Sequence, residues 1–293
     1  MDFDGDGDHD IISGDWLARV ILFRRTADGS FSAGEPVKDG QGRIIRIDGY
    51  GTYVYAVDWD ADGDLDVLAG TNDVMGEGSV WLVQNGGSRD KPAFGKPETL
   101  TAEGQVICVP EGNAAPVATD WDGDGQLDLV VGAGDGSVLW HRNIGSAQQP
   151  DLAAAQTLIP PPAQGSPRGD HARICVVDFN GDGRDDILLG DCGDQFEKTL
   201  SDEEVRWREE AREQQARMLR SWAGVFREYR ALLGSPLPEQ EDARRQREQE
   251  LARLRRELQR QSAIRNKYYR EEQALDAGMQ RHGRVWLFLR KGD

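Results

Sequence analysis

Four short aspartate-rich stretches contain the residue types most suited to chemistry in this chain. They occupy residues 2–10, 58–66, 120–128 and 178–186, and they align without a gap as Asp-aromatic-[Asp/Asn]-x-Asp-Gly-x-x-Asp. Positions one, three, five and nine therefore crowd hard oxygen ligands into one turn. Two unpaired charges 4 Å apart repel by about 1 kcal/mol in water and by about 4 kcal/mol at an effective dielectric of 20. A bound divalent cation would remove this repulsion.

Calcium suits these loops better than magnesium, because calcium accepts six to eight oxygens with loose geometry. Glycine at position six of every loop permits the sharp turn that wraps the chain around an ion. An EF-hand would need a bidentate Glu at position twelve and a helix on each side. Position twelve is instead Ser13, Ala69, Val131 and Leu189. An isolated acidic turn can be a merely solvated loop, but four turns in one register favour metal binding.

Short apolar runs rich in β-branched residues flank the loops and predict strands. A run follows every loop and ends in glycine, and three loops also have a run before them. A third strand is expected farther along each repeat, and a weaker fourth strand in three repeats. The expected strands are 54–57, 116–119 and 174–177 before the loops; 11–12, 67–69, 129–131 and 187–189 after them; 19–24, 79–84, 137–142 and 284–289 as third strands; and 31–37, 94–101 and 156–159 as fourth strands.

This repeat predicts an all-β fold. Four antiparallel strands in a repeat of about 60 residues are typical of a β-propeller blade, and radial repetition protects the edges of the sheets. Trp81, Trp140 and Trp286 lie in third strands, where we expect packing between blades, with a ligand platform as the alternative. The aromatic residue at loop position two is expected to pack beneath its loop.

A segment of different composition interrupts the fourth repeat. Residues 194–282 are rich in Arg, Glu, Gln, Ala and Leu, which are good helix formers. Residues 201–204 form a capping box, and apolar residues follow at three- and four-residue spacing. We expect an antiparallel α-helical hairpin, a coiled-coil insertion, with arms at about 200–233 and 239–276. The expected domains are the propeller blades at 1–193, the insertion at 194–282 and the third strand of the fourth blade at 283–293.

The charge distribution, the hydropathy and the cysteine content argue against some classes of partner and structure. The net charge is −17, but residues 194–282 hold 19 basic and 18 acidic residues, so the acidity belongs mainly to the loops. No basic stripe lies outside the insertion, which argues against a nucleic-acid partner. No apolar stretch reaches the length of a membrane span. Three cysteines cannot all pair within one chain, and we expect Cys108 and Cys175 to be buried free thiols.

The loop pattern, followed by an apolar triplet with Gly and by Gly-x-Val-x-x-x-x-Asn, resembles the FG-GAP or VCBS repeat. The resemblance covers roughly residues 1–193 and 283–293. It implies a β-propeller like that of integrin α-subunits, many secreted bacterial proteins, some fungal lectins and certain polysaccharide lyases. Propellers of this family commonly have more blades than the four loops here, so the resemblance implies an incomplete propeller.

In that family the side chains at positions one, three, five and nine and the main-chain carbonyl at position seven bind calcium. The resemblance therefore implies up to four Ca²⁺ ions. Carried over to this chain, the ligands are Asp2, Asp4, Asp6, Asp8 and Asp10; Asp58, Asp60, Asp62, Asp64 and Asp66; Asp120, Asp122, Asp124, Gln126 and Asp128; and Asp178, Asn180, Asp182, Arg184 and Asp186.

Two functions follow as hypotheses. The first is a noncatalytic calcium-binding propeller for extracellular adhesion or for carbohydrate or protein binding, located outside the cell, in the periplasm or at the cell surface. The second is the propeller of a secreted, lyase-like polysaccharide-degrading enzyme. Scattered histidines, with no Ser-His-Asp order and no zinc spacing, favour the first. Arg46 and Arg173 could face a central channel, although we interpret them as surface residues.

Two further expectations concern the ends of the chain and the insertion. The first repeat has no apolar strand before its loop, so we expect Met1 to be an internal residue of a longer protein with its signal peptide upstream. The helical hairpin is either a tolerated insertion without a role or a docking arm for another protein.

Overall fold

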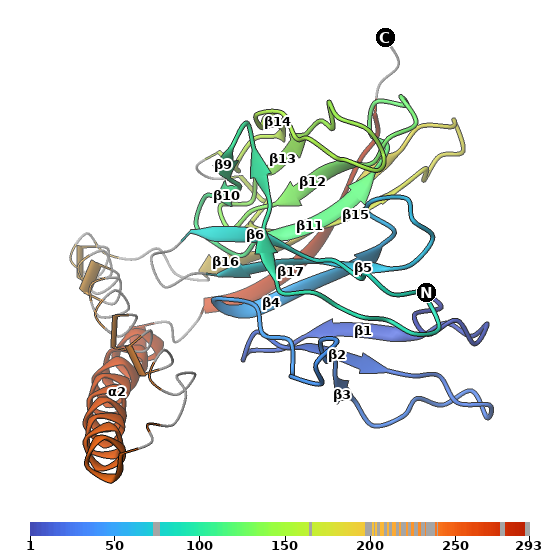
Figure 1. Cartoon of the computed structure of the whole chain (residues 1–293). Coiled ribbons are helices and arrows are strands. Elements are labelled where there is room, and N and C mark those ends of the chain that lie inside the picture. The colour runs from blue at the N-terminus through green and yellow to red at the C-terminus, as the bar shows by residue number, and fades with distance from the viewer. Residues whose placement is uncertain are drawn as a thin grey trace. The chain divides into compact units, whose positions relative to one another are not determined.

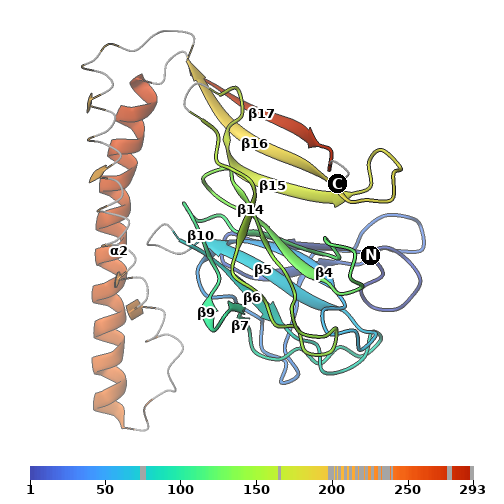
Figure 2. The ribbon, with the colours of Figure 1, turned by 90° about the horizontal axis from the view of Figure 1, so that it is seen from above.

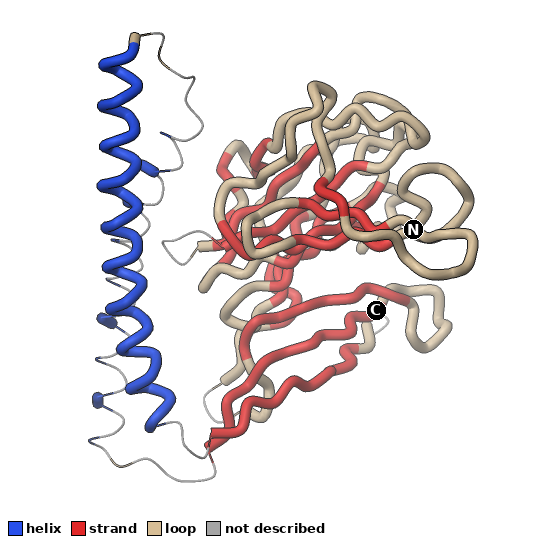
Figure 3. Tube along the Cα trace, turned by 90° about the horizontal axis from the view of Figure 1, so that it is seen from below, coloured by secondary structure: helices blue, strands red, loops and turns tan. Residues whose placement is uncertain are grey.

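The chain folds into two compact units, and the first contains the repeats. The computed structural model assigns residues 1–193 and 282–293 to this first unit, which is built of strands, and residues 194–281 to the second. The second unit contains the long helix α2 (Glu241–Leu275), which Figures 1 and 3 show as a single rod. The described residues are 1–72, 77–163, 166–196, 240–275 and 279–290, with scattered residues between 201 and 238. Among them, no helix is both long and apolar enough to cross a membrane.

The third repeat shows the fold of one complete repeat. Its strands β11 (Ala115–Thr119), β12 (Asp128–Gly132), β13 (Val138–His141) and β14 (Gln156–Ile159) form an antiparallel sheet in chain order. All four strands of this repeat were predicted from the sequence and are confirmed. Every residue of β12 is buried, because neighbouring sheets cover both faces of the strand.

The other repeats form three more antiparallel sheets, as predicted, although the described residues show no closed ring of blades. The first sheet contains β1 (Ile11–Gly14), β2 (Val20–Phe23) and β3 (Glu35–Pro36). The second contains β4 (Tyr50–Val57), β5 (Asp66–Asn72) and β6 (Gly78–Val83), with β7 (Glu98–Thr99) and β10 (Cys108–Val109) both paired to β6. The fourth contains β15 (Asp170–Val177), β16 (Asp186–Phe196) and β17 (Met279–Phe288), and β8 (Thr101–Ala102) pairs with β9 (Gln105–Val106) in a small hairpin.

Apolar layers lie between successive sheets. Val80 of the second sheet packs in one layer with Leu129 and Val131 of the third, and Val130 of the third packs in another with Ile187 of the fourth. The predicted packing of Trp81, Trp140 and Trp286 is confirmed, since each contacts one of the three layers.

In the first three repeats, a glycine in the strand after the loop lets the next sheet approach closely. A Cβ on Gly70 would overlap the carbonyl oxygen of Ala114, and a Cβ on Gly132 would overlap that of Ala172. Each of these carbonyls belongs to the following repeat. The short distance between sheets therefore requires glycine at these two positions.

The insertion differs in part from the expectation. Strand β16 runs to Phe196 and β17 begins at Met279, so both strands are longer than the predicted 187–189 and 284–289. Helix α2 lies within the predicted second arm, 239–276. The predicted first arm, 200–233, lies largely outside the described residues.

Three burial predictions were wrong. Cys108 and Cys175 are exposed rather than buried. Cys108 turns its side chain outward from the two-residue strand β10, and Cys175 lies on a face of β15 that no further sheet covers. The aromatic residue at loop position two is buried in the first three repeats, as predicted, but Phe179 is exposed in the fourth, because no described sheet follows to cover it.

Candidate metal centres

The aspartate at position one folds each loop around its own carboxylate. Asp120 Oδ1 accepts hydrogen bonds from the N–H groups of Gly123 and Asp124, both at 2.9 Å, and its Oδ2 accepts one from Gly125 at 2.8 Å. The position-one carboxylates of the other three loops accept equivalent bonds from the turn. In all four loops the position-five carboxylate accepts a bond from the N–H of position seven, at 2.9–3.1 Å. The loops thus share one backbone geometry.

The aspartate at position nine fixes each loop to its sheet. Asp128 Oδ2 accepts a bond from the N–H of Trp121, and its Oδ1 accepts one from Asn143, which follows the third strand. Asp10, Asp66 and Asp186 make the same two backbone contacts. These carboxylates are buried. An ionised carboxylate offers about four lone-pair sites, so each retains oxygen lone pairs for a cation.

In the first two loops the aspartate at position three has one oxygen with a protein partner and one without. Asp4 Oδ2 accepts a bond from Arg24 Nε at 2.9 Å, and Asp60 Oδ2 accepts one from Gln84 Nε2 at 2.5 Å. The other oxygens, Asp4 Oδ1 and Asp60 Oδ1, are buried and have no hydrogen-bond partner. Leaving a buried charged acceptor unsatisfied costs at least about 1–3 kcal/mol. A cation bound inside the loop would satisfy these oxygens, so the residues present fit a metal ion.

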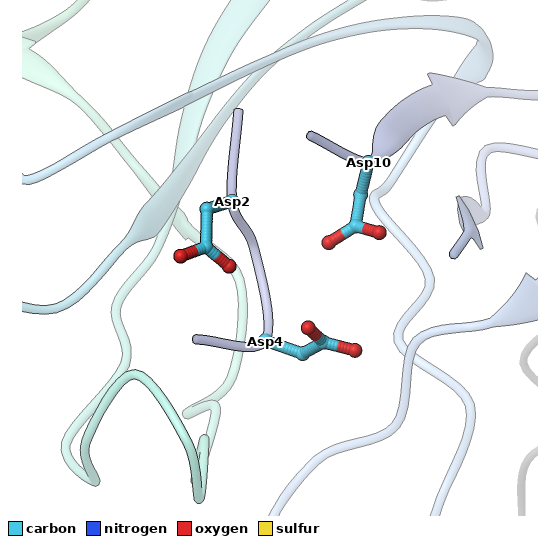
Figure 4. Close-up of side chains that lie close together, drawn as sticks. All are labelled: Asp2, Asp4 and Asp10. Carbon is cyan, nitrogen blue, oxygen red and sulfur yellow. The ribbon is translucent and has the colours of Figure 1, made fainter. Parts of the chain in front are cut away.

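Three of the loops gather three carboxylates each. The oxygens available within a group lie within 4.8 Å of one another. Figure 4 shows the side chains of Asp2, Asp4 and Asp10 around a common space at the start of β1. The groups are Asp2, Asp4 and Asp10; Asp58, Asp60 and Asp62; and Asp120, Asp122 and Asp124.

The remaining predicted ligands of these loops lie in the same turns with different exposures. Asp6 and Asp8 are exposed, Gln126 is half-buried, and Asp64 is buried with the position-nine residues. Gln126 Oε1 and Asp64 Oδ1 are also buried oxygens without a hydrogen-bond partner. The first loop therefore brings positions one, three and nine together, whereas the second and third bring positions one, three and five together.

Crowded negative charge perturbs the second loop. Burial and, to a smaller extent, the charges of Asp62, Asp60 and Asp58 together raise the pKa of Asp64 to about 6. Burial also raises the pKa of Asp66 to about 6, although backbone hydrogen bonds from Asn85 and Trp59 partly oppose it. Burial likewise raises the pKa of Asp128 in the third loop. A cation would reverse these shifts, because an opposite charge favours the ionised carboxylate.

The fourth loop has the same backbone but already contains its own hydrogen-bond donors. Asn180 Nδ2 donates to Asp182 Oδ2 at 3.2 Å, and Arg184 Nη2 approaches the same oxygen at 3.4 Å. Desolvation acts to raise the pKa of Asp182, but hydrogen bonds from Asn180 and Arg184 leave it lowered. Asp178 and Asp186 keep the backbone contacts of their counterparts. The internal donors make this loop the weakest candidate for a divalent ion.

Sequence reasoning did not assign the residues that hold position three. These are Arg24, Gln84 and Arg142, the polar residues that directly follow the third strands. Each contacts a position-three carboxylate, and Arg142 Nε pairs with Asp122 at 2.5 Å. The signal was present, because each of the first three repeats has a long polar side chain there. Arg46 is exposed, as interpreted, while Arg173 is half-buried and stacks 3.6 Å from the centroid of the Tyr53 ring.

Comparison with known families agrees with the loop geometry. Residues 2–69 and 120–189 match the family model described as FG-GAP-like repeat, and these two stretches contain all four acidic loops. A comparison with curated proteins found no match. The matches and the shared geometry of the four loops identify the chain as an FG-GAP/VCBS-type repeat protein.

Proposed function

We propose that this protein is a noncatalytic calcium-binding β-propeller module that serves extracellular adhesion or carbohydrate or protein binding. One observation carries the calcium assignment: buried position-three oxygens without partners lie among converging carboxylates in the first two loops. All the oxygens in these groups are hard donors, as calcium prefers. A location outside the cell, in the periplasm or at the cell surface accords with such sites, because extracellular calcium modules bind with dissociation constants of about 10⁻⁴–10⁻³ M.

Calcium would supply positive charge that ties several segments of a repeat together. Position one holds the turn, position nine holds the loop to the residue after the third strand, and position three reaches the end of that strand. A cation shared by these side chains lowers their mutual repulsion in the folded state. Removing the ion would leave the same carboxylates buried and unbalanced.

A cavity beside the first loop supports the ligand-binding part of the proposal. It has a volume of about 500 Å³, within the range of about 300–1,000 Å³ typical of small-ligand sites. Its lining contains both charge signs and includes Asp6, Arg24, Glu35, Lys38 and Asp90. Such a lining suits a polar ligand with several hydroxyl or charged groups, such as a sugar or an exposed peptide loop.

We also propose that the predicted arms, about 200–233 and 239–276, form an antiparallel helical hairpin that acts as a docking arm. Arg247 of α2 donates two hydrogen bonds to the carbonyl oxygen of Leu232, at 3.1 and 2.7 Å. Arg253 of α2 lies 3.9 Å from Glu228. Along these two pairs one residue number rises as the other falls, as antiparallel packing requires. Leu254 is buried within the same unit.

The calcium part of the proposal is tested by thermal unfolding in millimolar calcium and in chelator. With dissociation constants of about 10⁻⁴–10⁻³ M, about 1 mM calcium adds about 0.4–1.4 kcal/mol per site to the free energy of unfolding. Chelation should therefore lower the melting temperature by several degrees. Magnesium at the same concentration is the control and should restore less of the stability. An unchanged melting temperature would overturn the calcium assignment.

The binding part is tested with the calcium-loaded protein on an array of polysaccharides, with product analysis on every hit. Binding without product formation supports a noncatalytic module, and Lys38→Ala should weaken it because Lys38 lines the cavity without belonging to a metal loop. Release of unsaturated sugars would support the lyase alternative instead. It would contradict the noncatalytic assignment.

A further inference from the structure

The cavity beside the first loop lies between the first and second repeats, and both repeats contribute to its lining. The first repeat supplies the loop, Arg24 after β2, and the stretch from β3 to Lys38. The second supplies the turn 88–94, which folds back on the first repeat. The carbonyl oxygen of Phe94 accepts a hydrogen bond from the N–H of Gly40 at 3.1 Å. Figures 1 and 2 show the first sheet, in dark blue, beside the second.

The lining combines buried apolar side chains with charged ones. The apolar residues include Phe3, Leu22, Val37 and Phe94, and the charged residues are Asp4, Asp6, Glu35 and Asp90 with Arg24 and Lys38. Arg24 is held by Asp4 at 2.9 Å and by Glu35 at 3.4 Å. Lys38, by contrast, is exposed and has no ion-pair partner among the described residues. The lining therefore offers one positive charge that the protein itself does not neutralise.

The fold of a repeat does not need these charges. Glu35 pairs with Leu22 in the first repeat, and Glu98 pairs with Leu82 in the second, so the two repeats can be aligned along the cavity wall. The turns 88–91 and 146–149 also close with equivalent backbone contacts. One repeat farther along, the corresponding positions hold neutral residues: Gln84 for Arg24, Thr101 for Lys38 and Gln148 for Asp90. The charges therefore indicate a ligand rather than a requirement of folding.

The hydrogen-bonding capacity of the lining limits the class of ligand. An ionised carboxylate only accepts hydrogen bonds, and an ammonium group only donates them. A matching ligand must bring donors for the acidic side chains and an anionic acceptor for Lys38. A sugar acid carries both on one ring, as several hydroxyl groups beside a carboxylate, and its C–H groups can pack on the apolar part of the lining. An acidic peptide brings the carboxylate but fewer donors close to it.

We propose that the cavity binds a uronic acid unit of an acidic saccharide, with the sugar carboxylate at Lys38, and that calcium in the first loop raises the affinity. This inference rests on the proposed function, from which it takes the calcium site and the ligand-binding role of the cavity. It adds the class of saccharide and the regulation of its binding.

The charge balance of the cavity is the basis of this regulation. Its four acidic and two basic side chains have a formal charge of −2, which repels an anionic sugar. Asp4 and Asp6 line the cavity and also belong to the first loop, so an ion bound by the loop adds two positive charges beside the cavity. Coupling between two binding sites is reciprocal, so calcium and the saccharide should each raise the affinity of the other by the same factor, about 5- to 150-fold.

Calorimetric titration of the full chain tests the proposal. The probes are trisaccharides of several uronic acids and the neutral trisaccharides of the same sugars, each in calcium and in chelator. We expect binding of a uronate in calcium and binding at least about fivefold weaker in chelator, with little calcium dependence for the neutral probes. Titration of calcium, with and without the uronate, measures the same coupling from the other site. Circular dichroism at the assay temperature verifies that the β structure is retained in chelator.

Two outcomes of these titrations overturn the class of ligand. One is the absence of binding for every uronate in calcium. The other is a tri-glutamate peptide that binds as tightly as the best uronate, which would favour a protein ligand.

A pair of lysine variants locates the saccharide. Lys38→Thr introduces the residue found one repeat farther along, and it should weaken uronate binding about tenfold or more while the calcium content stays the same. The matched control is Lys96→Thr, which changes an exposed lysine outside the lining and should bind like the unmodified chain. Unchanged binding by Lys38→Thr, or equal weakening in both variants, overturns the assignment.

A pair of aspartate variants separates this inference from the proposed function. Asp2→Asn removes a charge from the first metal group without changing the cavity lining, and Asp58→Asn makes the same change in the second group. Asp2→Asn should abolish the calcium dependence of uronate binding, whereas Asp58→Asn should retain it. Loss in both variants would trace the effect to general stabilisation and overturn the coupling.

The calcium content of Asp2→Asn completes the test. An unmodified chain that binds no more calcium than Asp2→Asn would refute the proposed calcium site in the first loop. Calcium bound there, with a uronate affinity that it does not change, would refute only the coupling inferred here.

Discussion

The close approach of successive sheets predicts that one glycine-to-alanine change will be harmful and that its equivalent in the next repeat will be tolerated. Gly132 and Gly190 occupy equivalent positions in the third and fourth repeats, in the strand after the loop. A Cβ on Gly132 would overlap the carbonyl oxygen of Ala172 in the next sheet, whereas the nearest atom to a Cβ on Gly190 is the Arg173 carbonyl oxygen at 3.7 Å. Backbone atoms cannot rotate away, so Gly132→Ala must push two sheets apart.

The expected magnitudes follow from these distances. Overpacking a well-packed interior costs about 1–3 kcal/mol, while alanine in place of glycine at a compatible site stabilises by about 0.4–1 kcal/mol through the unfolded chain. The two variants should therefore differ by about 1.4–4 kcal/mol. At about 2–4 °C per kcal/mol for a domain of this size, Gly132→Ala should unfold about 3–16 °C below Gly190→Ala. Thermal unfolding in saturating calcium, followed by circular dichroism in the β region, measures the difference. Equal melting temperatures for the two variants would refute the assigned packing of the third and fourth sheets.

Two other perturbations have expected outcomes. In chelator, lowering the pH from 7 to about 5 should stabilise the protein, because the pKa of Asp64 and of Asp66 is about 6 in the folded chain against an ordinary 3.8. The folded state then takes up protons that the unfolded state does not. This stabilisation is at most about 1 kcal/mol per group between pH 7 and pH 5, and it is lost as the pH rises through 6. In calcium, lowering the pH should instead destabilise the protein, because protons compete with the ion for the carboxylates. Melting curves recorded across pH, with and without calcium, check both statements. Replacing residues 197–278 by a Gly-Asp-Gly turn should remove the helical signal while the β spectrum and the calcium-dependent melting shift remain. Loss of the β spectrum would show that the first unit needs the insertion.

Much of the fold could be predicted because the repeats supply the same pattern several times. The loops, the strands of the third repeat and the position-six glycines follow from local patterns of residue type and spacing. The ends of the fourth-repeat strands did not follow, because Gly190 was taken as a stop signal. In the structure Asp191 continues β16, and its carboxylate accepts hydrogen bonds from Gly169, Arg284 and Trp286, residues far apart in the sequence.

Burial could be predicted only where the neighbouring sheet could also be predicted. Cys175 and Phe179 occupy positions that are covered or largely covered in other repeats, and their exposure depends on which sheet comes next rather than on their own surroundings. The position-three partners were missed for a related reason. Arg24 and Asp4 are brought together by the register of a third strand, which spacing along the chain does not show.

The calcium content of the protein tests most directly whether the acidic loops are metal centres. The chain is stripped with chelator, dialysed into millimolar calcium and analysed for bound metal beside a variant with Asp4→Ala, Asp60→Ala and Asp122→Ala, which removes the position-three carboxylate from the three convergent groups. We expect calcium in at least these three loops of the unmodified chain and its loss from the variant, with the β spectrum retained in high calcium or at low temperature. A folded, unmodified chain that binds no calcium above the dialysis buffer would contradict the assignment of these loops as metal centres.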